Sequence, residues 1–405
     1  MYWADLHNHN EIGYGKGSLQ RSYALAENSL EVYAFTPHGH WPDPPSGDHG
    51  LVRAHAEAFE RVSVAFPEVV ATANARYRPG RFVTFPAYEW HSTRWGDYVV
   101  LFQGAEADLH RAGDLEDLKD FARRRGALLI PHHVAYRRGW RGLDWEALDP
   151  ELSPLVEVFN EHGNSLERDA LWPMLLHSMG GATESQSALA QMRRKRHFGL
   201  TAGTDNHYGY PASYGEGITG IVSDELTREA IFDALRARHT CAATGDRIEL
   251  SVRSGEALMG DVRPAGAARE FEVEVHPLAP LDTVRIVRNG QRAQLWPGPL
   301  RPDCPPAGNY LVRLHWGWGR MGQAESTDWD IAVQVRGGSL AGAIPCFCGG
   351  PATERASRIH AASATGLRIK SFTSRENRLP VSGVVLQMRG DPSTRLFVSA
   401  QIRVE

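Results

Sequence analysis

Short apolar runs that end in histidine or a carboxylate recur through the first 240 residues of the chain, which contain fifteen of its eighteen histidines. Amphipathic segments separate these runs. Alternation of this kind favours a mostly parallel sheet or a β/α barrel. Because a β/α barrel brings the carboxyl ends of its strands to one face, we expect the polar groups that follow the runs to meet in one pocket.

Six runs show this pattern, and they end in His7-Asn8-His9, His38-Gly39-His40, Glu89, His132-His133, Glu161-His162 and Asp205-Asn206-His207. In an extended chain the side chains alternate, so both members of His-x-His or Asp-x-His point the same way. Imidazole and carboxylate are ligands of divalent cations. Glu89 lies among apolar and aromatic residues, where a carboxylate is costly to bury unless cations pair with it. The pattern predicts a site for two or three divalent metal ions.

The first 240 residues also carry helix signals. Ser18 is expected to cap a helix that continues to Asn28, and residues 115–125 show helical spacing of apolar residues. Ser223 is expected to cap a helix that continues to Leu235.

After about residue 240 the pattern changes to eight short alternating segments, at 247–253, 270–276, 283–288, 310–316, 329–335, 367–372, 383–388 and 396–404. Such segments predict an antiparallel β-sandwich. We therefore expect two domains, an α/β domain at 1–240 and a β domain at 241–405.

Composition restricts the functional classes. With 405 residues and a formal net charge of −4, the chain has no basic excess of the kind that nucleic-acid binding requires. No apolar stretch is long enough to cross a bilayer, and no signal-peptide pattern opens the chain, so we expect a cytoplasmic protein. The four cysteines indicate no disulfide framework, and Cys346-Phe347-Cys348 is interpreted as a loop.

Five motifs in order resemble those of the polymerase and histidinol phosphatase (PHP) superfamily: Asp5-Leu6-His7-Asn8-His9, Thr36-Pro37-His38, Glu89, Pro131-His132-His133 and Thr204-Asp205-Asn206-His207. Three further segments resemble more closely a largely uncharacterised PHP branch with an appended β domain: residues 85–90, 130–133 and 238–247. The resemblance implies a distorted (β/α)7 barrel with a centre of two or three metals, followed by the β-sandwich domain.

The resemblance also implies a set of ligands. His7, His9, Glu89 and Asp205 would hold the first metal. Glu89 would bridge to a second, held by His132 and a ligand from the 157–162 run, where His162 is favoured over Glu157. His38 and His207 would bind a third. Pro37 and Gly15 depart from the family pattern at this third position, and His40 is a candidate substitute.

The chemistry that this set implies is hydrolysis, with a metal-bound water or hydroxide as nucleophile. We expect a small phosphomonoester or phosphodiester, and therefore an anionic small-molecule substrate. His40 and His133 are the candidate catalytic or substrate contacts. Lys16, Arg137 and Arg138 are the candidate substrate-binding residues, and Arg141 follows them on the same face.

Two alternatives remain open. The same metal site suits a carbamate, amide or carboxylic ester, which an apolar pocket of Trp41, Trp90 and Trp140 would favour. A catalytically silent binding protein is the other alternative, supported by Pro37 and Gly15. The pattern does not distinguish Zn, Mn and Fe. It also does not determine the natural substrate, the oligomeric state or the role of the β domain.

Overall fold

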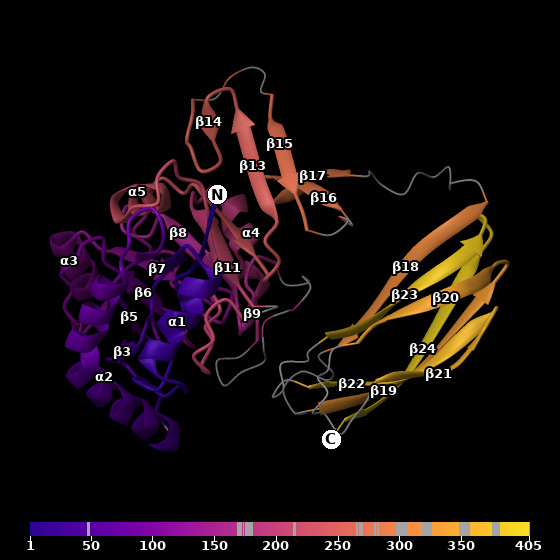
Figure 1. Ribbon diagram of the computed structural model, residues 1–405, viewed down its shortest axis with the longest axis horizontal. Helices are drawn as coiled ribbons and strands as arrows, with labels where there is room; N and C mark the ends of the chain where they lie inside the picture. Colours follow the sequence, from indigo (N-terminus) through magenta and orange to yellow (C-terminus); the bar gives the residue numbers. More distant parts are fainter. Residues whose placement is uncertain are drawn as a thin grey trace. The chain divides into compact units, whose positions relative to one another are not determined.

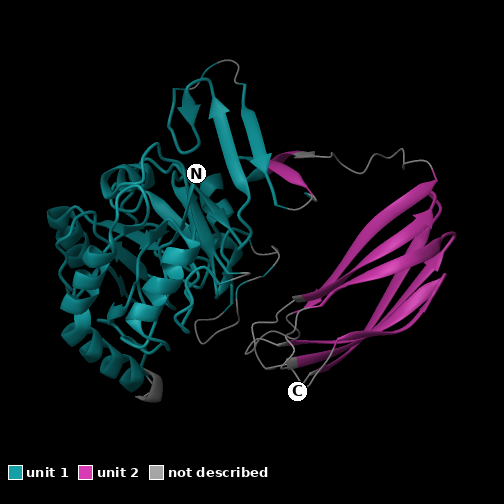
Figure 2. Ribbon diagram, in the orientation of Figure 1, with its two compact units in different colours: residues 1–282, 287–291 teal, residues 283–286, 292–405 magenta. Residues whose placement is uncertain are grey.

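A computed structural model describes most of the chain: residues 1–46, 49–167, 172, 174, 181–213, 216–264, 266, 270–278, 281, 283–296, 307–317, 326–347, 357–374 and 381–404. It forms two compact units (Figure 2). Unit 1 consists of Met1–Asp282 and Val287–Gln291, and unit 2 of Thr283–Ile286 and Arg292–Glu405. The position expected for a domain boundary, near residue 240, lies inside unit 1. The functional division at 240 stays a prediction.

The strands of unit 1 that surround the histidine motifs form three sheets (Figure 1). The first has the order β12-β11-β1-β2-β4, the second β3-β5-β6-β7, and the third β10-β8-β9. Their bounds are β1 Tyr2–Asp5, β2 Val32–Tyr33, β3 His38–His40, β4 Val83–Thr84, β5 Ala87–Trp90, β6 Tyr98–Leu101, β7 Leu128–Pro131, β8 Leu155–Asn160, β9 Gly163–Asn164, β10 Gly199–Ala202, β11 Ile218–Ile221 and β12 Thr240–Ala243.

Parallel and antiparallel pairs are mixed in these sheets. Strand β2 pairs in parallel with β1 and with β4, and β8 pairs in parallel with β10. Strands β11 and β6 pair antiparallel with β1 and β5. The α/β class is as the sequence predicted, but the expectation of mostly parallel pairing is wrong, because antiparallel pairs such as β11–β12, β6–β7 and β8–β9 occur in all three sheets. The distorted (β/α)7 barrel stays a prediction. A further antiparallel sheet contains β13 Glu249–Ser254, β14 Ala257–Leu258 and β15 Glu272–His276.

The described residues of unit 1 form five α-helices, α1 Leu19–Ser29, α2 His49–Arg76, α3 Leu115–Arg125, α4 Ala188–Arg193 and α5 Arg228–Arg236, and a 3₁₀ turn at Glu184–Gln186. The Ser18 side chain caps α1 as predicted, and α3 has the predicted bounds. The predicted start of α5 is wrong. Thr227 caps this helix by accepting from the Ala230 amide at 3.2 Å, while the Ser223 hydroxyl donates to the Glu225 carbonyl. The sequence did not predict α2.

The apolar faces of these helices cover the sheets. Tyr23 of α1, Phe66 of α2 and Phe121 of α3 belong to one buried cluster, together with the strand residues Tyr88 and Val100. A second cluster joins α5 to the strands β1 and β4. Within the described part of the chain, no helix combines the length and the apolar character needed to cross a membrane.

Unit 2 contains two antiparallel sheets, with the orders β18-β23-β20 and β21-β22-β19-β24. A shared apolar cluster includes Trp316 and Leu386 from one sheet and Ile331 and Ile369 from the other. The bounds are β18 Gly308–Gly317, β19 Ser326–Arg336, β20 Ser339–Cys346, β21 Arg358–Ser363, β22 Gly366–Ser374, β23 Val381–Gly390 and β24 Arg395–Val404. A hairpin of β16 Val284–Arg288 and β17 Gln291–Trp296 precedes them.

All eight alternating segments predicted after residue 240 are strands. The prediction missed β12, β14, β17, β20 and β21. Cys346 ends β20 instead of lying in a loop, and Cys348 lies outside the described residues. Cys241 and Cys346 are free thiols.

Candidate metal centre

The first and last histidine motifs lie side by side, although nearly 200 residues separate them. The Asp205 amide donates to the His7 carbonyl at 2.7 Å, and the His9 amide donates to the Asn206 carbonyl at 2.9 Å. Asp5 stabilises this junction by accepting from the Thr204 amide at 3.1 Å and from its hydroxyl at 2.7 Å. The backbone pairing therefore brings the His-x-His and Asp-x-His motifs together.

Glu89 is the central residue of the cluster. Strand β3 pairs in parallel with β5, and this register places His38 opposite Glu89. Atom Oε2 of Glu89 lies 3.6 Å from His7 Nε2, 3.4 Å from His9 Nε2 and 3.6 Å from His38 Nε2. Atom Oε1 lies 3.0 Å from His132 Nε2. One buried carboxylate thus faces these four imidazoles, which come from β3 and from the segments that follow β1 and β7, in two of the sheets.

Asp205 extends the same cluster. Its Oδ1 lies 2.9 Å from His9 Nε2 and 3.5 Å from His7 Nε2, and its Oδ2 lies 3.5 Å from His162 Nε2. Asp205 and His133 both have positive φ, at 53° and 34°. Strained backbone of this kind is found at functional sites, where the surrounding structure holds it in place.

The donor atoms fit divalent cations. Glu89 Oε2 and His7 Nε2 are buried and form no hydrogen bond with any described residue, although they lie only 3.6 Å apart. Buried polar atoms without a partner are costly, and a shared cation would satisfy both. Groups with donor atoms close enough for one ion are His7/His9/Glu89, His9/His38/His207, His38/Glu89/His91, Asp97/His132/His133 and Glu161/His162/Asp205.

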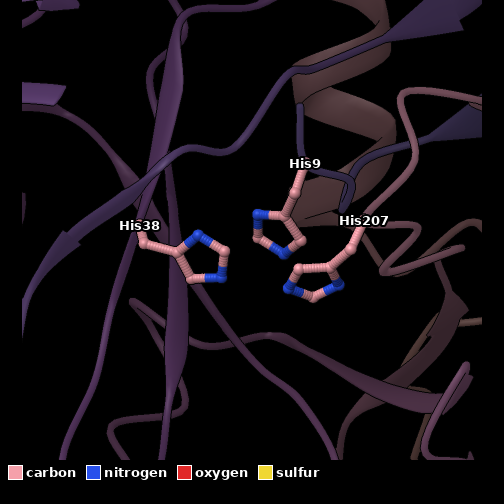
Figure 3. A group of neighbouring side chains, drawn as sticks. All are labelled: His9, His38 and His207. Carbon is pink, nitrogen blue, oxygen red and sulfur yellow. The ribbon is translucent and has the colours of Figure 1, made fainter. Parts of the chain in front are cut away.

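Figure 3 shows one of these groups, in which His9, His38 and His207 converge from three segments of the chain. The rings of His9 and His38 are stacked with centroids 3.9 Å apart, and the His9 and His207 centroids are 4.3 Å apart. The Tyr14 ring stacks on His38 at 3.8 Å. The donor atoms of His9, His38 and His207 all lie within 4.8 Å of one another. The third metal itself stays a prediction.

Glu157 orients His7 through the Nδ1 atom of its imidazole, on the side of the ring away from Glu89. Its two carboxylate oxygens lie 3.1 and 3.2 Å from His7 Nδ1, and Asn160 donates to Oε1 at 2.7 Å. A carboxylate behind a ligating imidazole holds the proton on Nδ1 and leaves Nε2 free to coordinate. Gly203 permits this pairing, because a Cβ there would lie 2.6 Å from the Glu157 carboxylate and 2.7 Å from His7 Cβ.

The electrostatics of His9, His38 and Glu89 suit metal binding. Burial lowers the pKa of His9 and of His38 well below the usual value, so both imidazoles are neutral. Burial would raise the pKa of Glu89, but the nearby His91 and His132 hold it well below its usual range. Neutral imidazole and ionised carboxylate are the forms that bind metals. Burial also lowers the pKa of His7, but Glu157 and Asp205 outweigh this effect and raise it.

The other residues expected in the site lie as follows. His162 Nδ1 is 2.9 Å from the Tyr136 hydroxyl, and its Nε2 faces Asp205. His133 Nε2 lies 3.4 Å from Asp97. Half-buried His40 lines a cavity of about 210 Å³ with Trp41, His55, Phe59 and Arg111, and it belongs to none of the described metal-ligand groups. Its role as substitute ligand or catalytic group stays a prediction.

The candidate substrate-binding residues are all exposed. Lys16 Nζ lies 5.3 Å from the Tyr208 ring centroid. Arg137 lies over the ring of Trp140, and Arg138 donates to Asp144 at 2.6 Å. Their contact with a substrate stays a prediction.

Two residues close to Glu89, His91 and Asp97, were not predicted as functional residues, and both contact Arg141, which the sequence had placed with Arg137 and Arg138 on the substrate face. His91 Nδ1 lies 3.2 Å from Glu89 Oε1 and 3.0 Å from Asp97 Oδ2. Arg141 donates to Asp97 from Nε at 2.8 Å. Glu89-Trp90-His91 repeats the alternate spacing of His-x-His, and this signal could have identified His91. Asp97 carries no comparable signal.

Comparisons with known proteins give partial similarities. Residues 177–270 match the model of a family described as protein of unknown function (DUF3604). An uncharacterised protein of Chlamydia pneumoniae is 31% identical over 177 residues, which are 40% of this chain and 28% of that protein. An uncharacterised protein of Chlamydia muridarum is 26% identical over 178 residues, with the same coverage of each chain. The matched part of the chain thus spans little more than a quarter of the length of these relatives.

Two solved structures are also similar. One is a two-domain protein containing a predicted PHP-like metal-dependent phosphoesterase from Bacteroides vulgatus, with 13% identity, a TM-score of 0.36 and coverage of 70% of this chain and 88% of that one. The other is PsfC from Pseudomonas syringae, with 17% identity, a TM-score of 0.36 and coverage of 60% and 90%.

Proposed function

We propose that the protein is a divalent-metal-dependent hydrolase that acts on a small phosphomonoester or phosphodiester. The observation that carries this proposal is the position of Glu89. It is a buried carboxylate with one oxygen that has no hydrogen-bond partner among the described residues, and the Nε2 atoms of three histidines surround that oxygen. Such an arrangement suits cations that share the carboxylate.

In this proposal His7, His9, Glu89 and Asp205 would hold the first cation. Glu89 and His132 would contribute to a second, and His162 lies beside Asp205 as a further donor. His38 and His207 are the donors for a third. When bound, zinc, manganese or iron at these positions would supply Lewis acidity and a nucleophile at neutral pH.

The other residues of the site prepare these ligands. Glu157 keeps the His7 proton on Nδ1, so that Nε2 faces Glu89. Asp97 accepts from the Ser92 amide at 3.0 Å and faces both His91 and His133, and so orients the imidazoles on the far side of Glu89. A rigid shell of this kind fixes the ligands before substrate arrives.

The surroundings of the cluster favour phosphate over a carbamate, amide or carboxylic ester. The apolar pocket expected for those substrates needed Trp41, Trp90 and Trp140. Trp90 is instead fully buried in the main core cluster, and Trp140 is exposed. The Arg141 guanidinium lies over Trp41, with its carbon 5.1 Å from the ring centroid. A guanidinium beside the metal ligands suits an anionic substrate.

The test begins with metal removal. Chelator-treated protein is to be reloaded with Mn²⁺, Zn²⁺ or Fe²⁺ and assayed on para-nitrophenyl phosphate, bis-para-nitrophenyl phosphate and para-nitrophenyl acetate. We expect metal-dependent release of nitrophenol from a phosphate ester, and we expect Glu89→Gln to abolish it. Activity on the acetate alone supports the ester alternative. Absence of metal binding and of all three activities supports the silent alternative and contradicts the proposal.

A further inference from the structure

The loop after β7 turns one of its arginines toward the metal cluster. In residues 137–142 the chain reverses, with positive φ at Gly139 (80°) and at Arg141 (67°), and the Gly142 amide donates back to the Arg137 carbonyl at 3.2 Å. The reversal leaves 59% of the Arg138 side chain exposed but only 13% of the Arg141 side chain. Positive φ is strained for a residue other than glycine, and the strain at Arg141 is explained by where the turn places its side chain.

The Arg141 guanidinium is held by groups on one side. Its Nε and Nη2 donate to Asp97 Oδ2, and Nη2 lies 3.0 Å from His91 Nδ1. Its backbone amide donates to the Thr93 carbonyl at 3.0 Å. Atom Nη1 donates to no described residue. The side chain is therefore fixed by its Nε edge and keeps a second edge available for a ligand.

The guanidinium also lies next to the residue that organises the cluster. His91 Nδ1 contacts Arg141 Nη2 at 3.0 Å and Glu89 Oε1 at 3.2 Å. A single imidazole atom therefore separates the Arg141 guanidinium from the Glu89 carboxylate. An anion held between the proposed metals and this edge would receive charge-assisted hydrogen bonds in the planar geometry that phosphate accepts.

We propose that Arg141 is the residue that binds the phosphate group of the substrate, and that the exposed Arg137 and Arg138 are not. This inference rests on the proposed function, and it assigns the residue that recognises the anionic phosphate oxygens of the substrate. Arg141 thus binds substrate beside the metals. Asp97 balances the charge of the Arg141 guanidinium and holds it in position.

Binding of inorganic phosphate tests this assignment without relying on turnover. Metal-loaded wild type, Arg141→Gln and Arg141→Lys are to be titrated with phosphate in a calorimeter, after their metal content and melting temperature have been measured. We expect the Kd for phosphate to rise about tenfold or more in Arg141→Gln, because a hydrogen-bonded charge contributes about that much. Arg141→Lys keeps a positive charge beside buried Asp97, so the fold is retained, but it loses the planar fork. We expect a smaller rise for this variant.

The matched control is Arg123→Gln. It removes an exposed arginine of α3 that donates a hydrogen bond to Asp149. Its phosphate affinity is expected to equal that of the wild type. Unchanged affinity in both Arg141 variants at full metal content overturns the assignment, as does a loss in Arg138→Gln alone. A metal-loaded wild type that binds no phosphate also overturns it. Phosphate binding that depends on Arg141, without hydrolysis of any ester, refutes the proposed function and leaves the assignment standing.

Discussion

The pairing of Glu157 with His7 allows the sharpest test of whether the cluster binds metal through the proposed ligands. Both oxygens of this buried carboxylate lie within 3.2 Å of His7 Nδ1, and Glu157 belongs to none of the described metal-ligand groups. Glu157→Gln keeps the size of the side chain but removes its charge. The His7 imidazole is then less firmly held in the tautomer that presents Nε2, and it becomes a weaker base.

The expected magnitude follows from the behaviour of such carboxylate–histidine–metal pairs. Loss of the outer partner lowers metal affinity by about 10- to 100-fold, which corresponds to about 1.4 to 2.8 kcal/mol. Asn160 donates to the same carboxylate at 2.7 Å and can still donate to the new amide oxygen, so the fold around β8 is retained. We therefore expect weaker binding without a change in the number of ions bound.

The assay is a competition titration with a chromophoric zinc chelator, combined with elemental analysis of the protein after dialysis. Glu31→Gln is the control, because Glu31 accepts a hydrogen bond from the Trp3 amide at 2.8 Å and is not part of the cluster. Unchanged zinc affinity in Glu157→Gln would refute the reasoning, since His7 would then not bind the metal through the Nε2 that Glu157 leaves free. A complete loss of binding would instead make Glu157 itself a ligand.

Three further predictions concern linkage and stability. Burial lowers the pKa of His207, but Glu161 outweighs it and raises the pKa to about 9, so in metal-free protein at pH 7.5 this imidazole is protonated. Metal binding there must release a proton and should strengthen as the pH rises toward 9. Calorimetry in buffers of different ionisation enthalpy measures this release, which His207→Gln should reduce. Thr227→Ala removes the cap of α5 and should cost about 1 kcal/mol in urea unfolding. Ile331→Ala should destabilise unit 2 by about 2 to 5 kcal/mol without reducing metal content, because all candidate ligands lie in unit 1.

Each of these predictions has a contradicting result. Heats of zinc binding that do not depend on the buffer would show that no proton leaves His207. If Thr227→Ala has the same free energy of unfolding as the wild type, the Thr227 cap does not stabilise the protein. Loss of metal from Ile331→Ala would show that the centre depends on unit 2.

The chemical character of the site could be predicted from the sequence because its motifs are local. His7 and His9 alternate along one extended segment, and a neighbour two residues away on such a segment points to the same side whatever the rest of the chain does. The same reasoning applied to Asp205 and His207. The strands β18, β19, β22, β23 and β24 of unit 2 were predictable for a similar reason, since alternation and turn residues act over a few positions.

Only the tertiary structure determined which groups orient the ligands and which arginine lies beside them. Glu157 meets His7 across 150 residues, and no local pattern contains that contact. Arg138 and Arg141 are equivalent in sequence, and the reversal of their loop sends one outward and the other to Asp97. Local alternation determines on which side of a strand a candidate ligand lies. Which residues contact and orient that ligand depends on how the sheets pack together, because these residues come from distant segments of the chain.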